Sequence, residues 1–158
     1  MQKLIFLLIL VLTLNSCGFT VIYQDSNSNN ISYQKELSTI KIQKNRGRLT
    51  QELRSALQDI FNPDLLKSEP KYILVLTLNK SVYGTFITSA GASGRNTVSL
   101  TVDYLLKSAK TGEALSIGTT QAIDNYDVQE NRFGTYTADE YVASNLTRVI
   151  AQNIRNLL

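Results

Sequence analysis

The side chains that could carry chemistry are few in this chain of 158 residues. The chain contains one cysteine, Cys17, and no histidine. Nucleophilic catalysis of the Ser-His-Asp or Cys-His type needs an imidazole base, and a structural zinc site needs several cysteine or histidine ligands. The sequence therefore excludes both kinds of site, and we expect no metal ion or other cofactor.

Carboxylates are the other groups that could act as catalysts. A pair of them can supply the acid and the base of glycoside hydrolysis. The candidates lie towards the C-terminus: Asp124, Asp127, Glu130, Asp139 and Glu140. Asp139 and Glu140 sit near the expected start of a helix, where the helix dipole stabilises negative charge, and the other three sit on a polar segment. We therefore expect a protein that is not an enzyme.

The N-terminus has the layout of an export signal. Lys3 is followed by an unbroken apolar run, residues 4–12, and then by the polar Thr13. A membrane-spanning helix needs about 20 apolar residues. Because this run is shorter, a cleaved signal peptide is the better interpretation.

The sequence LNSC, residues 14–17, resembles the bacterial lipobox. In that family of signals the peptidase cuts before the cysteine, and the thiol becomes a thioether to diacylglycerol. The resemblance implies a signal peptide at residues 1–16 and acyl chains on Cys17; two or more chains anchor stably, because each buried methylene contributes about 0.8 kcal/mol. Gly18 resembles the residue at this position in lipoproteins forwarded to the outer membrane of Gram-negative cells. A stray thiol or an intermolecular disulfide is the alternative for Cys17.

Composition sets further bounds. The net charge of +3 and the pI near 9.0 are a mild basic bias, so we expect no nucleic-acid partner. One cysteine cannot form a disulfide within the chain, so the fold must be held by packing. The length suits one domain with its own core.

Apolar periodicity predicts six elements. Residues 17–35 combine the acylated cysteine with a flexible leash, and residues 36–158 form a single domain. The elements follow in this order: a strand at 37–43, a helix at 48–61, strands at 71–83, 95–108 and 114–123, and a final helix. We expect an α+β fold, a small mixed or antiparallel four-stranded sheet with two helices packed on one face, in the order β-α-β-β-β-α.

The second strand and the last helix carry distinct signals. Residues 72–78 are almost continuously apolar, which is typical of a strand buried on both faces. Thr137 and Glu140 match the capping box, in which a threonine and a glutamate three residues later satisfy the first amides of a helix. The last helix is therefore expected to begin at Thr137.

A family resemblance rests on the lipobox followed by Gly18-Phe19 and Tyr23, on the helix from Arg48, and on the ending YDVQENRFGTYTADEYVASNLTRVIAQNIRNLL. Together these resemble the LptE family, the lipoprotein component of the outer-membrane lipopolysaccharide translocon.

The resemblance implies a non-catalytic protein that plugs the β-barrel LptD, supports its assembly and assists delivery of lipopolysaccharide to the cell surface. The expected location is the periplasmic side of the Gram-negative outer membrane, with the acyl chains as the membrane contact. The alternative is an accessory lipoprotein of another lipid-transport or secretion complex.

The segment 84–94 joins two predicted strands and carries no charge until Arg95. One interpretation is a solvent-exposed loop. The other is a tip that enters a narrow barrel and contacts its wall through Phe86, Ile87, Ser89 and Ser93.

Lipopolysaccharide carries phosphates, which pair with arginine and lysine. Arg95 is the first candidate for such a contact, because it lies at the base of the uncharged segment. The weaker candidates are Lys80, Lys107, Lys110 and Arg132. For each of the five, an ordinary solvated surface charge is the alternative interpretation and the one that the residue type favours.

Overall fold

The computed structural model describes residues 29–87 and 93–158. By internal contacts the chain divides into two units, Met1–Ile31 and Ser32–Leu158, and the second carries the fold described below. The signal peptide, Cys17 and Ser89 lie outside the described residues. No helix within those residues has the length and apolar character needed to cross a membrane.

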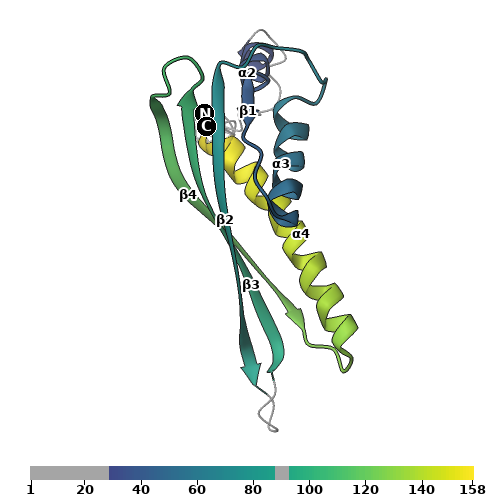
Figure 1. Cartoon of the computed structure of the whole chain (residues 1–158). Helices are drawn as coiled ribbons and strands as arrows, with labels where there is room; N and C mark the ends of the chain where they lie inside the picture. The colour runs from purple at the N-terminus through teal and green to yellow at the C-terminus, as the bar shows by residue number, and fades with distance from the viewer. Residues whose placement is uncertain (1–28, 88–92) are drawn as a thin grey trace, which may run out of the picture. The chain divides into compact units, whose positions relative to one another are not determined.

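Three helices and four strands make up the described part of the chain (Figure 1). In chain order they are α2 (Asn29–Leu37), β1 (Ile40–Ile42), α3 (Arg48–Phe61), β2 (Tyr72–Ile87), β3 (Ser93–Ser108), β4 (Ala114–Asp127) and α4 (Arg132–Leu157). The sheet order is β1-β2-β3-β4, with β1 parallel to β2 and the other pairs antiparallel. The predicted α+β fold with a four-stranded mixed sheet is confirmed.

The core lies between the sheet and one layer of helices, α3 and α4. Alternation along β3 turns Val98, Leu100 and Val102 towards this layer, and each has 0% of its surface exposed. Leu57 of α3 and Ile150 of α4 are equally buried on the other side. Complete burial of such a side chain contributes about 1.5–3 kcal/mol, so this interface is the main source of stability.

β2 differs from the prediction that both of its faces are buried. Leu74 and Leu76 face the helices and are buried, whereas Ile73 and Val75 on the opposite face are only half-buried. Ile73 and Val75 are only half-buried because α3 and α4 both pack on the other side of the sheet. The apolar run of β2 therefore meets a helix layer on one side only.

The start of α4 also differs from the prediction. The helix begins at Arg132, and the side chain of Asn131 caps it by accepting a hydrogen bond of 2.5 Å from the Gly134 amide. Thr137 lies inside the helix, where its hydroxyl donates to the Phe133 carbonyl at 2.9 Å. The capping box was wrong because Asn is an equally good cap residue, and a threonine within a helix can bond the carbonyl four residues back.

Helix α2 was not expected, since the leash was predicted to continue to residue 35. Gln34 donates from Nε2 to the carbonyls of Ile60 and Phe61, at 3.1 and 3.0 Å, and so caps the end of α3. Leu37, at the end of α2, is 3% exposed. The helix has only a weak apolar face, so its stability comes from these tertiary contacts.

Two ion pairs tie α4 to the rest of the fold. Lys80 on β2 pairs with Asp139, and both side chains are mostly buried, at 22% and 16% exposure. Arg48 at the start of α3 pairs with both Glu52 and Glu140. Asp139 and Glu140, predicted as cap residues, instead join the helix to the sheet and to α3.

A close approach between two strands occurs at Gly118. Gly118 lies opposite Tyr104 in the register of β3 and β4. A Cβ atom at position 118 would lie 2.5 Å from the Tyr104 hydroxyl oxygen, and Tyr104 is only 6% exposed. The ring therefore packs directly over the glycine backbone, which is a reason for glycine within a strand.

We expect Gly118→Val to lower the free energy of unfolding by about 1–3 kcal/mol, because the added atoms would overpack the site under Tyr104. Urea unfolding of the purified protein measures the loss. Combining Gly118→Val with Tyr104→Ala should cost less than the sum of the two single changes, and Ile117→Val, on an exposed neighbour, should cost little. Full additivity of the two changes would show that the ring does not occupy this space.

Candidate functional site

The face of the sheet opposite the helices is one candidate surface. We call it the open face; it carries the odd-numbered side chains of β2, β3 and β4. Val75, Leu105 and Ile117 are neighbours in register and form an apolar row across the three strands. Ile117 is 75% exposed, so the row is available to a partner.

Polar side chains on the rest of the open face bond across the strands. Thr97 donates to Asn125 Oδ1 at 2.5 Å, and Gln121 Nε2 donates to Ser99 Oγ at 2.8 Å. Thr97 and Ser99 are each 4% exposed although they lie on the face opposite α3 and α4. These contacts stabilise the sheet and satisfy the polar groups that they join.

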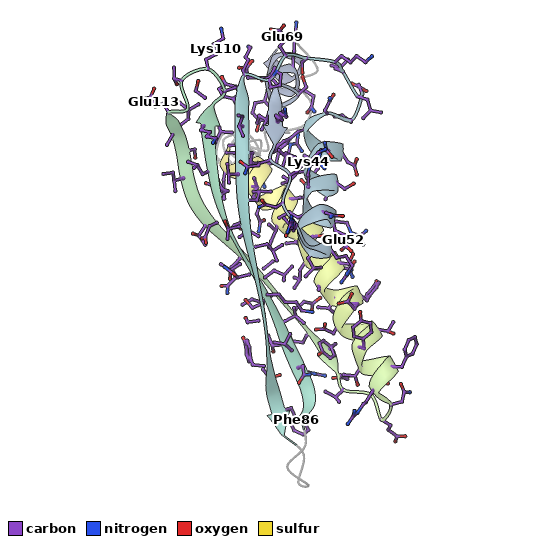
Figure 2. All side chains as sticks on the ribbon, viewed as in Figure 1. Lys44, Glu52, Glu69, Phe86, Lys110 and Glu113 are labelled. Atoms are coloured by element: carbon purple, nitrogen blue, oxygen red, sulfur yellow. The ribbon has the colours of Figure 1, made fainter. Side chains whose placement is uncertain are left out.

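The hairpin of β2 and β3 ends in exposed apolar residues. Phe86 is 60% exposed and pairs with Arg95 at a register shift, and Figure 2 shows it at one end of the sheet. The predicted connection, residues 84–94, was too long, because the strands continue to Ile87 and resume at Ser93, which pair with each other. Of the four predicted contact residues, three therefore lie on the strands and Ser89 lies outside the described residues.

An aromatic surface on α4 was missed by the sequence reasoning. Phe133, Tyr136 and Tyr141 are 78%, 62% and 68% exposed, all in the first half of the helix. Tyr136 also lines a groove of about 500 Å³, together with Val82 and Asp139. Phe133 and Tyr136 precede Thr137, so the prediction that the helix begins at Thr137 left both in a loop. Their aromatic side chains were the sequence signal for this surface. Exposed aromatic groups of this kind mark interaction surfaces.

The predicted phosphate-binding cations do not form one site. Arg95 and Lys107 are separated by twelve residues of β3, or about 40 Å of extended strand. Lys110 lies in the turn after β3, at the end of the sheet opposite Phe86 (Figure 2). Arg132 is exposed at the start of α4 and lines the groove, while Lys80 is paired with Asp139.

Arg95 is itself engaged by a carboxylate. Its Nε donates to Asp127 Oδ1 at 2.8 Å, across the β3–β4 pair, and both side chains are more than half exposed. The hydrogen bond to Asp127 raises the pKa of Arg95 above its usual value. An anion that binds Arg95 must therefore compete with Asp127.

The opposite end of the sheet carries a second cluster that the sequence did not predict. Glu36 accepts from Lys71 Nζ at 3.1 Å and from the Tyr72 hydroxyl at 2.9 Å. The hydrogen bond from Lys71 has the largest effect and lowers the pKa of Glu36, and the hydrogen bond from Tyr72 lowers it further. Beside it lies an apolar pocket of about 260 Å³ that includes Leu37 and Leu106. All of the polar groups named here are paired, as is common for structural contacts.

The carboxylates show no catalytic arrangement in the part of the chain that the structure covers. Asp127, Asp139 and Glu140 are each held by a basic side chain. No cluster of three or more potential metal ligands occurs among residues 29–87 and 93–158. That the protein is not an enzyme stays a prediction.

Comparison with known proteins identifies the fold. No protein-family model and no curated protein matches the chain. A "putative lipoprotein" of Caulobacter crescentus has a similar structure, with a TM-score of 0.65 and 22% identity over 78% of this chain and 90% of its own.

Two further solved structures are similar. Rare lipoprotein B of Shewanella oneidensis gives a TM-score of 0.55 and 12% identity over 73% of this chain and 87% of its own. A minor lipoprotein of Acinetobacter baumannii gives a TM-score of 0.54 and 16% identity over 74% of this chain and 88% of its own. At these identities the likeness establishes a shared fold, and that fold is one found in bacterial lipoproteins.

Proposed function

We propose that the protein is a non-catalytic lipoprotein of the LptE type, anchored through Cys17 on the periplasmic side of the outer membrane. It plugs an LptD-like β-barrel, supports the assembly of that barrel and assists the delivery of lipopolysaccharide. The sequence resemblance supplies the family, and the shared fold with solved lipoproteins supports it.

One observation carries the proposal: the domain exposes apolar and aromatic side chains on elements that are otherwise well packed. The exposed fractions are 60% at Phe86, 78% at Phe133 and 75% at Ile117. Phe86 lies at the end of the hairpin, Ile117 on the open face and Phe133 at the start of α4. Exposed apolar groups on several elements suit a protein that is surrounded by a partner. A protein that worked by chemistry would instead need free reactive groups in a cavity.

The alternative, an accessory lipoprotein of another lipid-transport or secretion complex, would use the same anchor and the same surfaces. Affinity isolation of the tagged full-length lipoprotein in mild detergent distinguishes the two. Recovery of a large outer-membrane barrel favours the LptE-type function, and recovery of an inner-membrane transporter favours the alternative.

We expect Cys17→Ser to leave an uncleaved precursor that takes up no labelled fatty acid, since the thiol is the expected site of the thioether. Metabolic labelling with palmitate and the mobility of the protein on a gel measure both effects. Ser16→Gly, which keeps a small residue before the cysteine, is the matched control and should be processed normally. Normal cleavage and labelling of Cys17→Ser would refute the anchor.

A photo-crosslinking residue at Phe86 should form adducts with the barrel in cells, because the tip of the hairpin is expected to contact the barrel wall. The same residue at Glu113, exposed at the opposite end of the sheet (Figure 2), is the control. Immunoblotting for both proteins detects the adducts. Adducts at Glu113 with none at Phe86 would contradict insertion of the tip.

Lipopolysaccharide binding should respond in opposite directions to changes at the two partners of the Arg95–Asp127 pair. Arg95→Gln should weaken binding several-fold, because a cation that can pair with phosphate is lost. Asp127→Asn should strengthen it, because the competing carboxylate is removed. Titration of the purified full-length protein with lipopolysaccharide at low salt measures both, and unchanged binding in both variants would exclude Arg95 from the contact.

A further inference from the structure

The two edges of the sheet are built differently. On the β1 side the edge strand is only three residues long. Beyond it the chain stays bonded to β2, because the Gln43 amide donates to the Leu74 carbonyl and the Asn45 side chain donates to the Leu76 carbonyl. Further along this edge, β2 has register shifts between Gly84 and Ile87. Short edge strands and irregular pairing are devices that prevent a sheet from pairing with further strands.

The β4 edge has no such protection. β4 is 14 residues long and is paired with β3 from Asp127 back to Ala114. No strand among residues 29–87 and 93–158 pairs with its other side. From Ala114 to Ile123 the sequence contains no charged residue and no proline. An uncharged, proline-free strand on an open edge is a template for the addition of another strand.

The backbone groups that such a strand would meet can be assigned from the register. The Val128 amide donates to the Gly94 carbonyl, so the even-numbered residues of this strand direct their amide and carbonyl groups towards β3. Because these groups alternate along an antiparallel pair, the odd-numbered residues from Ile117 to Asn125 direct theirs outwards. Within the described residues the structure shows no backbone partner for these outward groups. The Asn125 amide donates to the Asp124 side chain at 2.8 Å, so the amides available to a new strand run from Ile117 to Ile123.

We propose that the outer edge of β4 binds an extended segment of the partner protein as a fifth strand of the sheet. This inference rests on the proposed function, in which the partner is the barrel. A closed barrel wall has no free edge, so the segment comes from a loop or a domain of the partner that lies outside the wall strands. The contact is a main-chain ladder, with side chains supplying specificity.

The side chains of β4 define the chemistry of the segment. Ile117 and Ile123 are 75% and 53% exposed, so the segment presents apolar side chains opposite both positions. Between them β4 has only uncharged residues, which an uncharged segment matches. Asp124 and Asp127 are the charged residues of β4 and both are acidic, so the segment is neutral or basic at that end.

The charges also disfavour a second copy of this chain as the occupant. The antiparallel register that sets Ile117 of one copy against Ile123 of the other also sets Asp127 against Glu113 at both ends. Directly opposed like charges destabilise a strand pair. A strand of another protein avoids this repulsion.

Proline substitution tests the ladder with the full-length chain. Ile117→Pro and Ile123→Pro remove amides that point outwards and that the fold itself does not use, whereas Ile117→Val and Ile123→Val keep them. The tagged, lipidated variants are coexpressed with the barrel and isolated in mild detergent. We expect each proline variant to recover about tenfold less barrel than wild type and the valine variants to recover the same amount. Equal recovery by folded proline variants would overturn the proposal.

Hydrogen exchange of the wild-type protein gives a test that does not depend on any variant folding. The amides of Ile117, Thr119, Gln121 and Ile123 should exchange rapidly in the isolated lipoprotein in detergent and at least tenfold more slowly in the barrel complex. Rapid exchange in the complex would overturn the proposal while leaving the proposed function intact.

Failure of the proposed function gives a distinct result. If wild type recovers no barrel, exchange is measured on the protein in native envelope membranes. Slow exchange at the outward amides there supports strand addition by another protein, and rapid exchange overturns it. A chemically crosslinked homodimer that the proline variants abolish would also overturn it, since the occupant would then be a second copy.

Discussion

Packing of α4 and α3 against a single face of the sheet is the interaction on which the rest of the structure depends. The alternation of β3 directs Val98, Leu100 and Val102 into this interface, where they are completely buried. No disulfide can replace that packing, because the chain has one cysteine. Among residues 29–87 and 93–158 no helix packs on the other face of the sheet, so the same arrangement that buries one face leaves Ile117 on the other face 75% exposed.

The tertiary contacts that position α4 also decide what its polar residues can do. Asp139 pairs with Lys80 of the sheet, and Glu140 pairs with Arg48 of α3. In both pairs the carboxylate is mostly buried and its basic partner comes from another element. These residues therefore join α4 to the sheet and to α3.

Those surfaces differ in character along the sheet. The end that contains Phe86 carries exposed apolar and aromatic groups, together with the Arg95–Asp127 pair. The opposite end carries Glu36, Lys71 and Lys110. Strands of 16 residues span about 50 Å, so the two ends are too far apart to contact one small ligand.

Much of the fold was predictable from local pattern. The alternation of residues 95–108 and the helical spacing of residues 48–61 each identified an element and its buried face, because a strand or a helix needs only its own periodicity to define the side that packs. The contacts of α2, the true start of α4 at Asn131, the half-exposed second face of β2 and the separation of the five cations were decided by tertiary structure. Each depends on which elements become neighbours, and periodicity within one segment carries no information about residues that are distant along the chain.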